Sequence, residues 1–199
     1  MSAGLFIVLE GIDGAGKTEQ SGRLCVRLRA LGCRVLETRE PTDGMWGRRY
    51  RSFARGELEA SADEVLDFFL RDRREHVDRE IAPALLRGDV VVCDRYVAST
   101  LAYQAAQGID REKLRARSDA EAFPVPDLTL WLRIPIQTSL GRLGSRALER
   151  FEREAFLERV DQEYEALGFE PIDDAGRVEQ VEAALWERVS PLLSSLQAR

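Results

Sequence analysis

Histidine and cysteine are scarce in this sequence, and their scarcity excludes several kinds of site. The single histidine, His76, cannot build a histidine-rich metal centre and would have to serve any serine-hydrolase mechanism alone. The three cysteines are odd in number, widely spaced and set among apolar residues: Cys25, Cys33 and Cys93. This pattern predicts reduced, buried thiols in place of disulfides or a zinc site, which is typical of a cytoplasmic protein.

Long apolar runs and an excess of basic residues are also lacking. The longest apolar runs, at 5–9 and 90–93, are far shorter than the roughly 20 residues that a membrane helix needs. The first residues have no basic region before a short apolar stretch, so they do not resemble a secretion signal. The net charge of −6 disfavours a nucleic-acid polymer as partner, because binding its phosphate backbone needs a basic face. We therefore predict a cytoplasmic protein with neither a membrane nor a nucleic-acid partner.

The length of the chain and its alternating pattern predict one α/β domain. The 199 residues are too few for two enzymes and enough for a large core. Strands are predicted at 5–10, 34–38, 89–94, 127–132 and 169–172, and helices fill the intervals. One long helix is predicted at 62–86, with a kink at Pro83. We expect a single domain over 1–199, in which helices sandwich a parallel sheet of about five strands and ligands bind at the carboxyl ends of the strands.

Lysine is almost absent, and one of the two lysines occupies a motif. Among 29 basic residues only Lys17 and Lys113 are lysines. Lys17 belongs to GIDGAGKT, residues 11–18, which fits the phosphate-loop (P-loop) pattern of a glycine, four residues, and then Gly-Lys-Ser/Thr. An apolar run of strand length precedes this loop, and leucines at helical spacing follow it. Strand, loop and helix therefore come in the order that a phosphate-binding loop requires.

The motif indicates binding of nucleotide phosphates. Glycines let main-chain N–H groups approach a phosphate at a helix N-terminus, where the helix dipole favours anions. Lys17 would reach the β- and γ-phosphates of ATP, and the Thr18 hydroxyl would ligate Mg²⁺. Asp94, at the carboxyl end of a predicted strand, is the type of carboxylate that accompanies this ion. A turn that merely joins a strand to a helix is the alternative. The nucleotide-binding residues expected from the loop are Gly11, Asp13, Gly14, Ala15, Gly16, Lys17 and Thr18.

The chain resembles the thymidylate kinases in five segments that come in the family's order and approximate spacing. These are EGIDGAGKTEQ, TREP, FFLRDRREHV, DRYVASTLAYQ and PDLTLWL. The DRY segment with its following serine and AYQ is specific to this family, whereas PDL before an apolar strand is shared with many phosphate-loop kinases. The resemblance covers nearly the whole chain. It implies a nucleoside-monophosphate-kinase fold and transfer of the γ-phosphoryl group of Mg-ATP to thymidine monophosphate (dTMP), giving dTDP for dTTP synthesis.

Such a reaction needs cations, because it brings two polyanions together. Unit charges about 4 Å apart cost roughly 4 kcal/mol at an effective dielectric near 20. Planar guanidinium groups suit phosphate oxygens. The resemblance places Arg39 and Arg95 near the acceptor phosphate, with Arg95 also near the transferred group. Alternatively each arginine pairs with its neighbour in sequence, Arg39 with Glu40 and Arg95 with Asp94.

The resemblance also implies residues for the base and sugar of the acceptor. Phe69 and Arg73 are four residues apart, on one face of a helix, and match the pair that stacks on thymine and hydrogen-bonds its carbonyl edge. The alternative is that Phe69 is ordinary core and Arg73 a solvated charge. Asp13 matches the acid that contacts the 3′-hydroxyl, although it could simply stabilise the loop. The segment for base and sugar comprises Ser99, Thr100, Tyr103 and Gln104, and its tyrosine crowds the 2′ position.

A mobile lid is implied at 145–153, SRALERFER. The spacing of Arg146, Arg150 and Arg153 places them on one face of a helical turn. Gly14 stands where one branch of the family has an arginine, so the chain resembles the bacterial branch, whose lid supplies the arginine. Such a residue contributes about 10³–10⁵ in rate. Arg150 is the first candidate for this catalytic arginine and Arg146 the second. Interleaved glutamates favour a salt-bridged surface helix as the alternative.

Other readings of the function stay open at this point. The chain departs from the family in TREPTDG, in Arg133 and in AYQAAQG, which lacks the usual glycine run. A related deoxynucleoside monophosphate kinase is one alternative, and a P-loop nucleotide-binding regulator without turnover is another. Intact Lys17, Thr18, Asp94 and Arg95 argue against the regulator. The resemblance and the apolar helix faces lead us to expect a homodimer.

Overall fold

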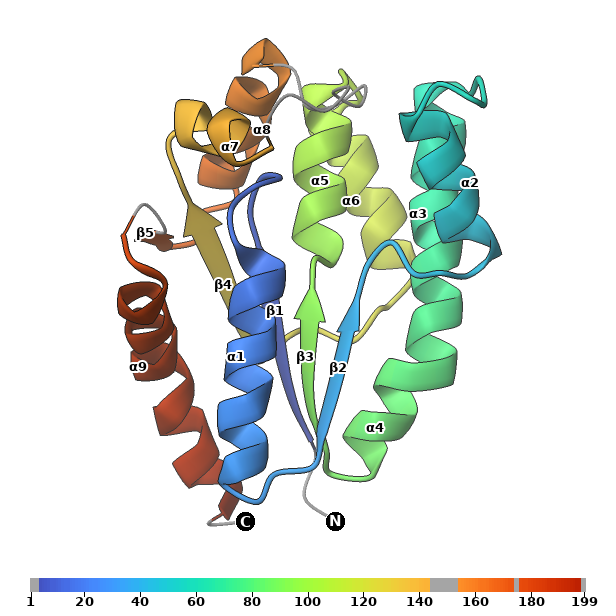
Figure 1. Ribbon diagram of the computed structural model, residues 1–199. Coiled ribbons are helices and arrows are strands. Elements are labelled where there is room, and N and C mark those ends of the chain that lie inside the picture. The colour runs from blue at the N-terminus through green and yellow to red at the C-terminus, as the bar shows by residue number, and fades with distance from the viewer. Residues whose placement is uncertain (1–3, 144–153, 174–175, 198–199) are drawn as a thin grey trace.

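A parallel sheet between two layers of helices forms the core of the protein, seen in a computed structural model that describes residues 4–143, 154–173 and 176–197 (Figure 1). The strands are β1 (Leu5–Glu10), β2 (Val35–Arg39), β3 (Val90–Asp94), β4 (Leu128–Arg133) and β5 (Pro171–Asp173). Their spatial order is β2-β3-β1-β4-β5, and each neighbouring pair runs parallel. The predicted α/β fold with five parallel strands is confirmed; β1 has the predicted bounds, and the ends of the other strands differ by no more than two residues.

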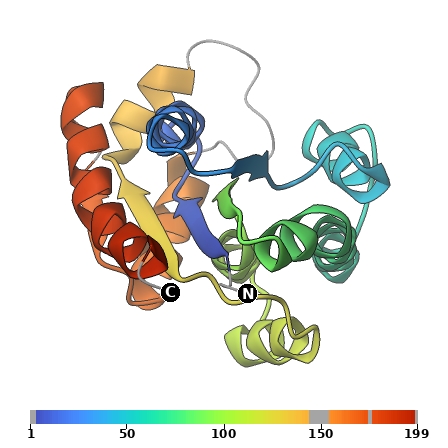
Figure 2. The ribbon, with the colours of Figure 1, turned by 90° about the horizontal axis from the view of Figure 1, so that it is seen from below.

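Helices occupy the intervals between the strands. They are α1 (Lys17–Ala30), α2 (Met45–Ala54), α3 (Ala62–His76), the π-helical turn η1 (Val77–Ile81), α4 (Ala82–Leu86), α5 (Val97–Ala106), α6 (Arg111–Ala120), α7 (Ile136–Leu143), α8 (Glu154–Ala166) and α9 (Val178–Gln197). Seen along the sheet, α1 and α6 lie on opposite sides of it (Figure 2). Within the described ranges, no helix has the length and apolarity needed to cross a membrane.

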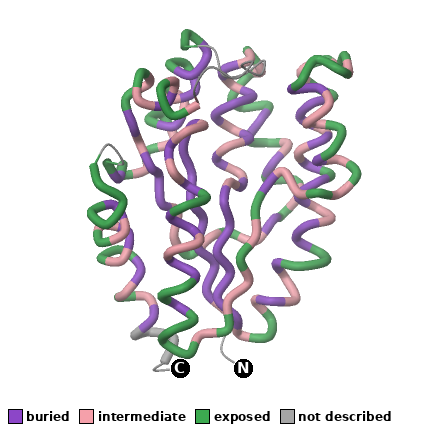
Figure 3. The backbone as a smooth tube through the Cα atoms, viewed as in Figure 1, coloured by how far each residue is buried: buried purple, intermediate pink, exposed green. Residues whose placement is uncertain are grey.

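Strand β1 shows why the sheet holds two helical layers. All six of its residues are buried, and successive side chains of a strand point to opposite faces. Ile7 belongs to one apolar cluster together with Leu24 of α1, and Phe6 belongs to a second cluster together with Leu66 of α3. Strands buried on both faces are typical of parallel sheets covered by helices. Figure 3 shows the buried strands at the centre and exposed residues along the outer helices.

The register of the strands brings three chain segments to one edge of the sheet. Leu9 of β1 and Arg39 of β2 both lie beside Asp94 of β3. Because the strands are parallel, the loops that follow them leave the sheet at the same edge, at the top of Figure 1. The P-loop at 11–18 therefore lies near the segment that follows β2.

The long helix predicted at 62–86 is divided into three parts. Ser61 begins α3 with a capping box, in which Ser61 and Glu64 exchange side-chain and backbone hydrogen bonds. Pro83 has no N–H group, and just before it the chain forms a π turn, closed by the Ala82 N–H to the Val77 carbonyl. The interruption predicted at Pro83 thus occurs as η1, one turn earlier.

The cysteines are free thiols, as predicted, but they are not equally buried. Cys25 and Cys93 are buried, whereas Cys33 is half-exposed. The prediction of a buried thiol is wrong for Cys33, because the residue lies in the turn between α1 and β2 and not within an element that faces the core.

Candidate active site at the carboxyl edge of the sheet

The main chain of the P-loop takes conformations that suit glycine. Gly11 has a φ of 142° and Gly14 a φ of 77°. A Cβ atom on Gly11 would lie 2.3 Å from the carbonyl oxygen of Leu132, so no side chain fits there. Gly16, also in the left-handed region at 72°, precedes the first residue of α1. The loop thus curves around the N-terminus of α1, where main-chain N–H groups favour an anion.

Lys17 lies inside this curve and is 6% exposed. Its Nζ donates a hydrogen bond to the Ile12 carbonyl at 2.8 Å. Burial, with the nearby Arg95 guanidinium, lowers the pKa of Lys17 to about 8, although Asp94 and Asp13 oppose the shift. A phosphate beside Nζ would favour the charged amine, so the loop presents a lysine whose charge an anionic ligand stabilises.

Thr18 and Asp94 form a set of oxygens suited to Mg²⁺. The Thr18 hydroxyl donates to Asp94 Oδ2 at 2.7 Å. The other carboxylate oxygen, Oδ1, is buried and has no hydrogen-bond partner. Mg²⁺ is commonly held by one or two protein oxygens together with substrate phosphates and water. The donor chemistry therefore fits this ion.

Arg95 follows β3 and has an unusual backbone for a residue with a side chain. Its φ is 70°, and such strain is common at functional sites. Its guanidinium donates to the Gly11 carbonyl (2.9 Å), Ser99 Oγ (3.1 Å), Asp13 Oδ1 (2.7 Å) and Tyr103 Oη (3.3 Å). The alternative pairing of Arg95 with Asp94 is absent among the described contacts. Arg95 instead joins the P-loop to α5.

Asp13 receives hydrogen bonds from both Arg95 and Tyr103, the latter at 3.1 Å. Burial alone would raise the pKa of Asp13, but the charges of Arg95 and Lys17 hold it below its usual range. Asp13 is therefore an anion within a cationic cluster. This arrangement stabilises the loop and also leaves its half-exposed carboxylate in the pocket described next.

A pocket of about 490 Å³ opens beside Arg95, between α2, α3 and α5. Six residues predicted for the acceptor line it: Asp13, Arg39, Phe69, Arg95, Ser99 and Tyr103. Arg39 is mostly exposed, and its nearest carboxylate is Asp43 at 3.5 Å, so the alternative pairing with Glu40 is wrong. Phe69 is half-buried, with the Tyr50 ring 4.4 Å from its own. It lines the pocket and is not solely a core residue.

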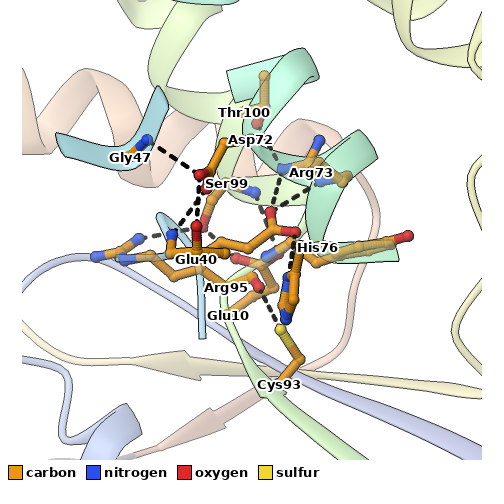
Figure 4. Close-up of polar contacts among 12 residues, drawn as sticks. Glu10, Glu40, Gly47, Asp72, Arg73, His76, Cys93, Arg95, Ser99 and Thr100 are labelled. Atoms are coloured by element: carbon orange, nitrogen blue, oxygen red, sulfur yellow. Dashed lines mark hydrogen bonds and ion pairs between the residues drawn. The ribbon is translucent and has the colours of Figure 1, made fainter. Parts of the chain in front are cut away.

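Arg73 is 1% exposed, so the alternative that it is a solvated surface charge is wrong. Its Nε donates to Glu40 Oε2 at 2.8 Å, and its Nη2 forms an ion pair with the same oxygen at 2.7 Å and donates to Thr100 Oγ1 at 2.9 Å. Burial disfavours the charge of Arg73, but Glu40 outweighs this effect and raises its pKa. Figure 4 shows Glu40 between Arg73 and His76.

Thr100, Gln104 and Arg73 are buried and do not line the pocket. Gln104 is fully buried, and neither its amide nitrogen nor its amide oxygen has a hydrogen-bond partner. Nη1 of Arg73 is likewise buried without a partner. Buried polar groups are normally satisfied, so this set of unused donors and acceptors calls for an explanation.

Sequence reasoning missed Glu10 as a member of the site. Its buried carboxylate accepts hydrogen bonds from the Tyr96 and Ser99 N–H groups at the start of α5, and from the Ser99 and Tyr164 hydroxyls. Burial raises the pKa of Glu10, although Ser99 and Arg95 oppose the shift. The sequence shows Glu10 as an acidic residue at the end of an apolar strand, which could have marked it as a site residue. Its partners, however, lie about 90 to 150 positions further along the chain.

Asp72 and two residues of α7 were missed as well. Asp72 accepts from the N–H and hydroxyl of Thr42 (2.8 and 2.6 Å) and from the Gly47 N–H (3.0 Å), which fixes the segment after β2 (Figure 4). Ser139 donates to the Asp13 carbonyl at 2.6 Å, and Arg142 donates to the Gly14 carbonyl at 3.0 Å. No local sequence pattern predicts these hydrogen-bond partners.

The lid predicted at 145–153 lies outside the described residues. Arg146, Arg150 and Arg153 are therefore not placed relative to the site.

Four features meet at one edge of the parallel sheet. They are the phosphate-binding loop, Lys17 within it, the pair of Thr18 and Asp94, and Arg95 directly after β3. This fold and site define a P-loop phosphotransferase of the nucleoside-monophosphate-kinase type. The family model described as "Thymidylate kinase" matches residues 9–182 of the chain. The chain belongs to the thymidylate kinase family.

Curated relatives agree with this assignment. A thymidylate kinase of Xanthomonas oryzae pv. oryzae (strain PXO99A) is 49% identical over 160 residues, which cover 78% of this chain and 68% of the relative. One from Xanthomonas euvesicatoria pv. vesicatoria is 48% identical over 168 residues, covering 82% and 72%. One from Akkermansia muciniphila is 48% identical over 156 residues, covering 77% and 74%.

Proposed function

We propose that the P-loop holds the phosphates of ATP and that the pocket between α2, α3 and α5 holds dTMP. As a member of the thymidylate kinase family, the chain transfers the γ-phosphoryl group of ATP to dTMP and releases dTDP and ADP. The proposal assigns this chemistry to particular residues. Lys17 is assigned to the donor phosphates, and Arg39 and Arg95 to the acceptor phosphate.

The position of Arg95 is the single observation that best supports this assignment. Its guanidinium contacts the Gly11 carbonyl of the P-loop and also Ser99 and Tyr103 of the pocket. A cation that touches both regions is placed to offset the repulsion between two phosphate groups as they approach each other. Arg95 is therefore assigned to the transferred phosphoryl group as well as to the acceptor.

The unsatisfied groups behind the pocket support a pyrimidine with a carbonyl at position 4. Nη1 of Arg73 can only donate, and the Gln104 amide can both donate and accept. The edge of thymine offers an acceptor at O4, a donor at N3 and an acceptor at O2. Cytosine has a donor amino group at position 4, which faces a guanidinium unfavourably. We assign Arg73 and Gln104 to this edge, Phe69 to the face of the base and Tyr103 to the 2′ position of the sugar.

Mg²⁺ is part of the proposal. Thr18 Oγ1 and the unpartnered Asp94 Oδ1 would hold it. Bound by these oxygens, Mg²⁺ would supply positive charge beside the donor phosphates.

Three further proposals come from the sequence. The resemblance implies the lid arginines Arg150 and Arg146 as the catalytic arginine and a homodimer as the functional assembly, which the apolar helix faces also favour. A cytoplasmic location rests instead on the sequence expectations of reduced cysteines and no secretion signal.

A substrate panel tests the function. ADP release, followed in a coupled assay, is expected with dTMP, weakly with dUMP and not with dCMP. The methyl group that separates thymine from uracil is worth only about 1–3 kcal/mol, whereas a mismatched hydrogen-bond edge costs more. In the variant Gln104→Leu, kcat/KM for dTMP is expected to fall strongly.

The matched control is Gln107→Leu, at the C-cap of the same helix, whose amide nitrogen already bonds the Tyr103 carbonyl, whereas both amide atoms of Gln104 lack a partner. It should keep its activity with dTMP. Equal turnover of dTMP and dCMP would contradict the assignment of the base edge, and ADP release with no monophosphate would favour a regulator without turnover.

A further inference from the structure

The single histidine of the chain lies beside the proposed acceptor site and has no assigned role. The side chain of His76 is fully buried. Its Nδ1 is 3.1 Å from Glu40 Oε1, and its Nε2 is 2.7 Å from Thr38 Oγ1. One ring nitrogen therefore contacts Thr38 near the end of β2, and the other contacts Glu40, the residue after this strand.

The two residues that His76 contacts flank Arg39. Side chains alternate along a strand, so residues 38 and 40 point to one side and residue 39 to the other. This matches their exposure, since Glu40 is buried and Arg39 is exposed in the pocket. The imidazole thus holds the chain on both sides of an arginine assigned to the acceptor phosphate.

The same contact continues to the arginine assigned to the base. Glu40 bonds His76 through Oε1 and Arg73 through Oε2, and Arg73 continues to Thr100 on α5. Glu40 is also fixed through its main chain, because its N–H donates to the Asp94 carbonyl at 2.9 Å. One connected path therefore joins β2, α3 and α5 (Figure 4).

The ring meets its two contacts with different nitrogens. Glu40 accepts hydrogen bonds, so Nδ1 donates to it, while the Thr38 hydroxyl lies 2.7 Å from Nε2 and 3.4 Å from Glu80 Oε2. The remaining charged group near the ring is Glu80, with Oε2 3.9 Å from Nε2 and about half exposed. The ring thus acts as a spacer of fixed length between Thr38 and Glu40.

We propose that His76 is a positioning residue for the acceptor nucleotide, setting Arg39 and Arg73 through Thr38 and Glu40. This inference rests on the proposed function, because it needs the acceptor at these two arginines. Stability alone explains the network poorly, since well-packed apolar residues often replace a buried ion pair without loss of stability. A path that ends at one exposed and one unsatisfied arginine is better explained by a ligand that both arginines contact.

The kinetic constants of four variants test the proposal. His76→Phe keeps the ring shape and removes both nitrogens, and it should raise KM for dTMP by about tenfold or more, because it removes a hydrogen bond to a charged group. Thr38→Val removes the hydroxyl that contacts the ring and should raise this KM by about threefold, the cost of one neutral hydrogen bond. Thr38→Ser restores the hydroxyl and should restore the KM. In all three variants KM for ATP should stay near that of the parent. Asp78→Asn, the matched control, removes an exposed carboxylate of η1 that pairs with Arg74 and not with Thr38, Glu40 or His76, and it should change neither constant.

Two arginine variants separate this proposal from the proposed function. If Arg39→Ala and Arg73→Ala raise KM for dTMP while His76→Phe and Thr38→Val do not, the positioning role is overturned and the acceptor site stands. If the arginine variants also leave this KM unchanged, the acceptor site itself is wrong. Should His76→Phe fail to fold, the pair Thr38→Val and Thr38→Ser decides. An equal rise in both KM values in Thr38→Val would indicate a merely structural role and overturn the proposal.

Discussion

The donor side and the acceptor side of the site are built from different parts of the chain. On the donor side the main chain of one loop forms the cradle, and Lys17 bonds a carbonyl only five positions away. On the acceptor side, contacts between side chains that are distant in sequence form the binding site. Arg73, for example, is 33 positions from its partner Glu40 and 27 from its partner Thr100. A cradle of main-chain amides needs only a local sequence, whereas a cradle of side chains needs the completed sheet.

The largest expected effect is the loss of the donor cation. In Lys17→Met, kcat should fall by at least about 10²–10³, the cost of removing one preorganised electrostatic group from a transition state. The thermal midpoint should not fall, because the buried charge of Lys17 does not favour folding. Its folded pKa of about 8 lies below the unfolded value of 10.5, so this group costs stability below pH 8, and the cost disappears as the pH rises towards 10.5.

Kinetics and thermal melts of this variant check both statements. Turnover equal to that of the parent would refute the donor assignment, and a sharply lower melting temperature would show that the lysine holds the loop together instead.

An intermediate effect is expected from the backbone of the loop. Backbone strain alone would cost about 1–3 kcal/mol in Gly11→Ala. The free energy of unfolding should fall by more than this, because the new Cβ would also clash with the Leu132 carbonyl. Gly32→Ala is the matched control, since Gly32 has a φ of 85° and open space around its Cβ position. Chemical denaturation measures the difference between the two variants. Equal losses would mean that the contact with β4 does not constrain the loop.

The smallest effect is a difference in pH dependence between the two sides. KM for ATP should rise above about pH 8 by up to about tenfold per pH unit, because the amine of Lys17 then loses the charge that attracts phosphate. KM for dTMP should stay flat from about pH 7 to 9, because arginines remain protonated there. Initial rates across this pH range measure both constants. Parallel profiles for the two substrates would remove the contrast between the sides.

The contrast also explains how far the sequence predicts the protein. Alternating strand and helix patterns suffice for the parallel sheet, and the residues of the P-loop are contiguous, so their common location follows from the motif. The resemblance supplied Arg39, Phe69, Arg95 and Tyr103, which share one pocket.

The partners of these residues could not be predicted. Glu10, Glu40 and Asp72 are buried carboxylates whose hydrogen bonds come from elements far away in sequence. No periodicity or spacing encodes such pairs, because they exist only after β2, α3 and α5 have packed together. The alternative for Arg73 failed for this reason: a surface charge and a buried, paired arginine have the same local pattern.

The hydrogen bonds of Glu10 affect how the donor and acceptor sides of the site can change during evolution. Glu10 accepts hydrogen bonds from N–H groups at the start of α5 and so occupies the positive end of that helix. The acceptor nucleotide therefore has to be recognised by side chains. Point mutations can exchange those side chains one at a time, while the amides of the P-loop are common to almost any sequence with glycine in the right places. Changes of substrate should therefore accumulate on the monophosphate side, with the triphosphate side left as it is.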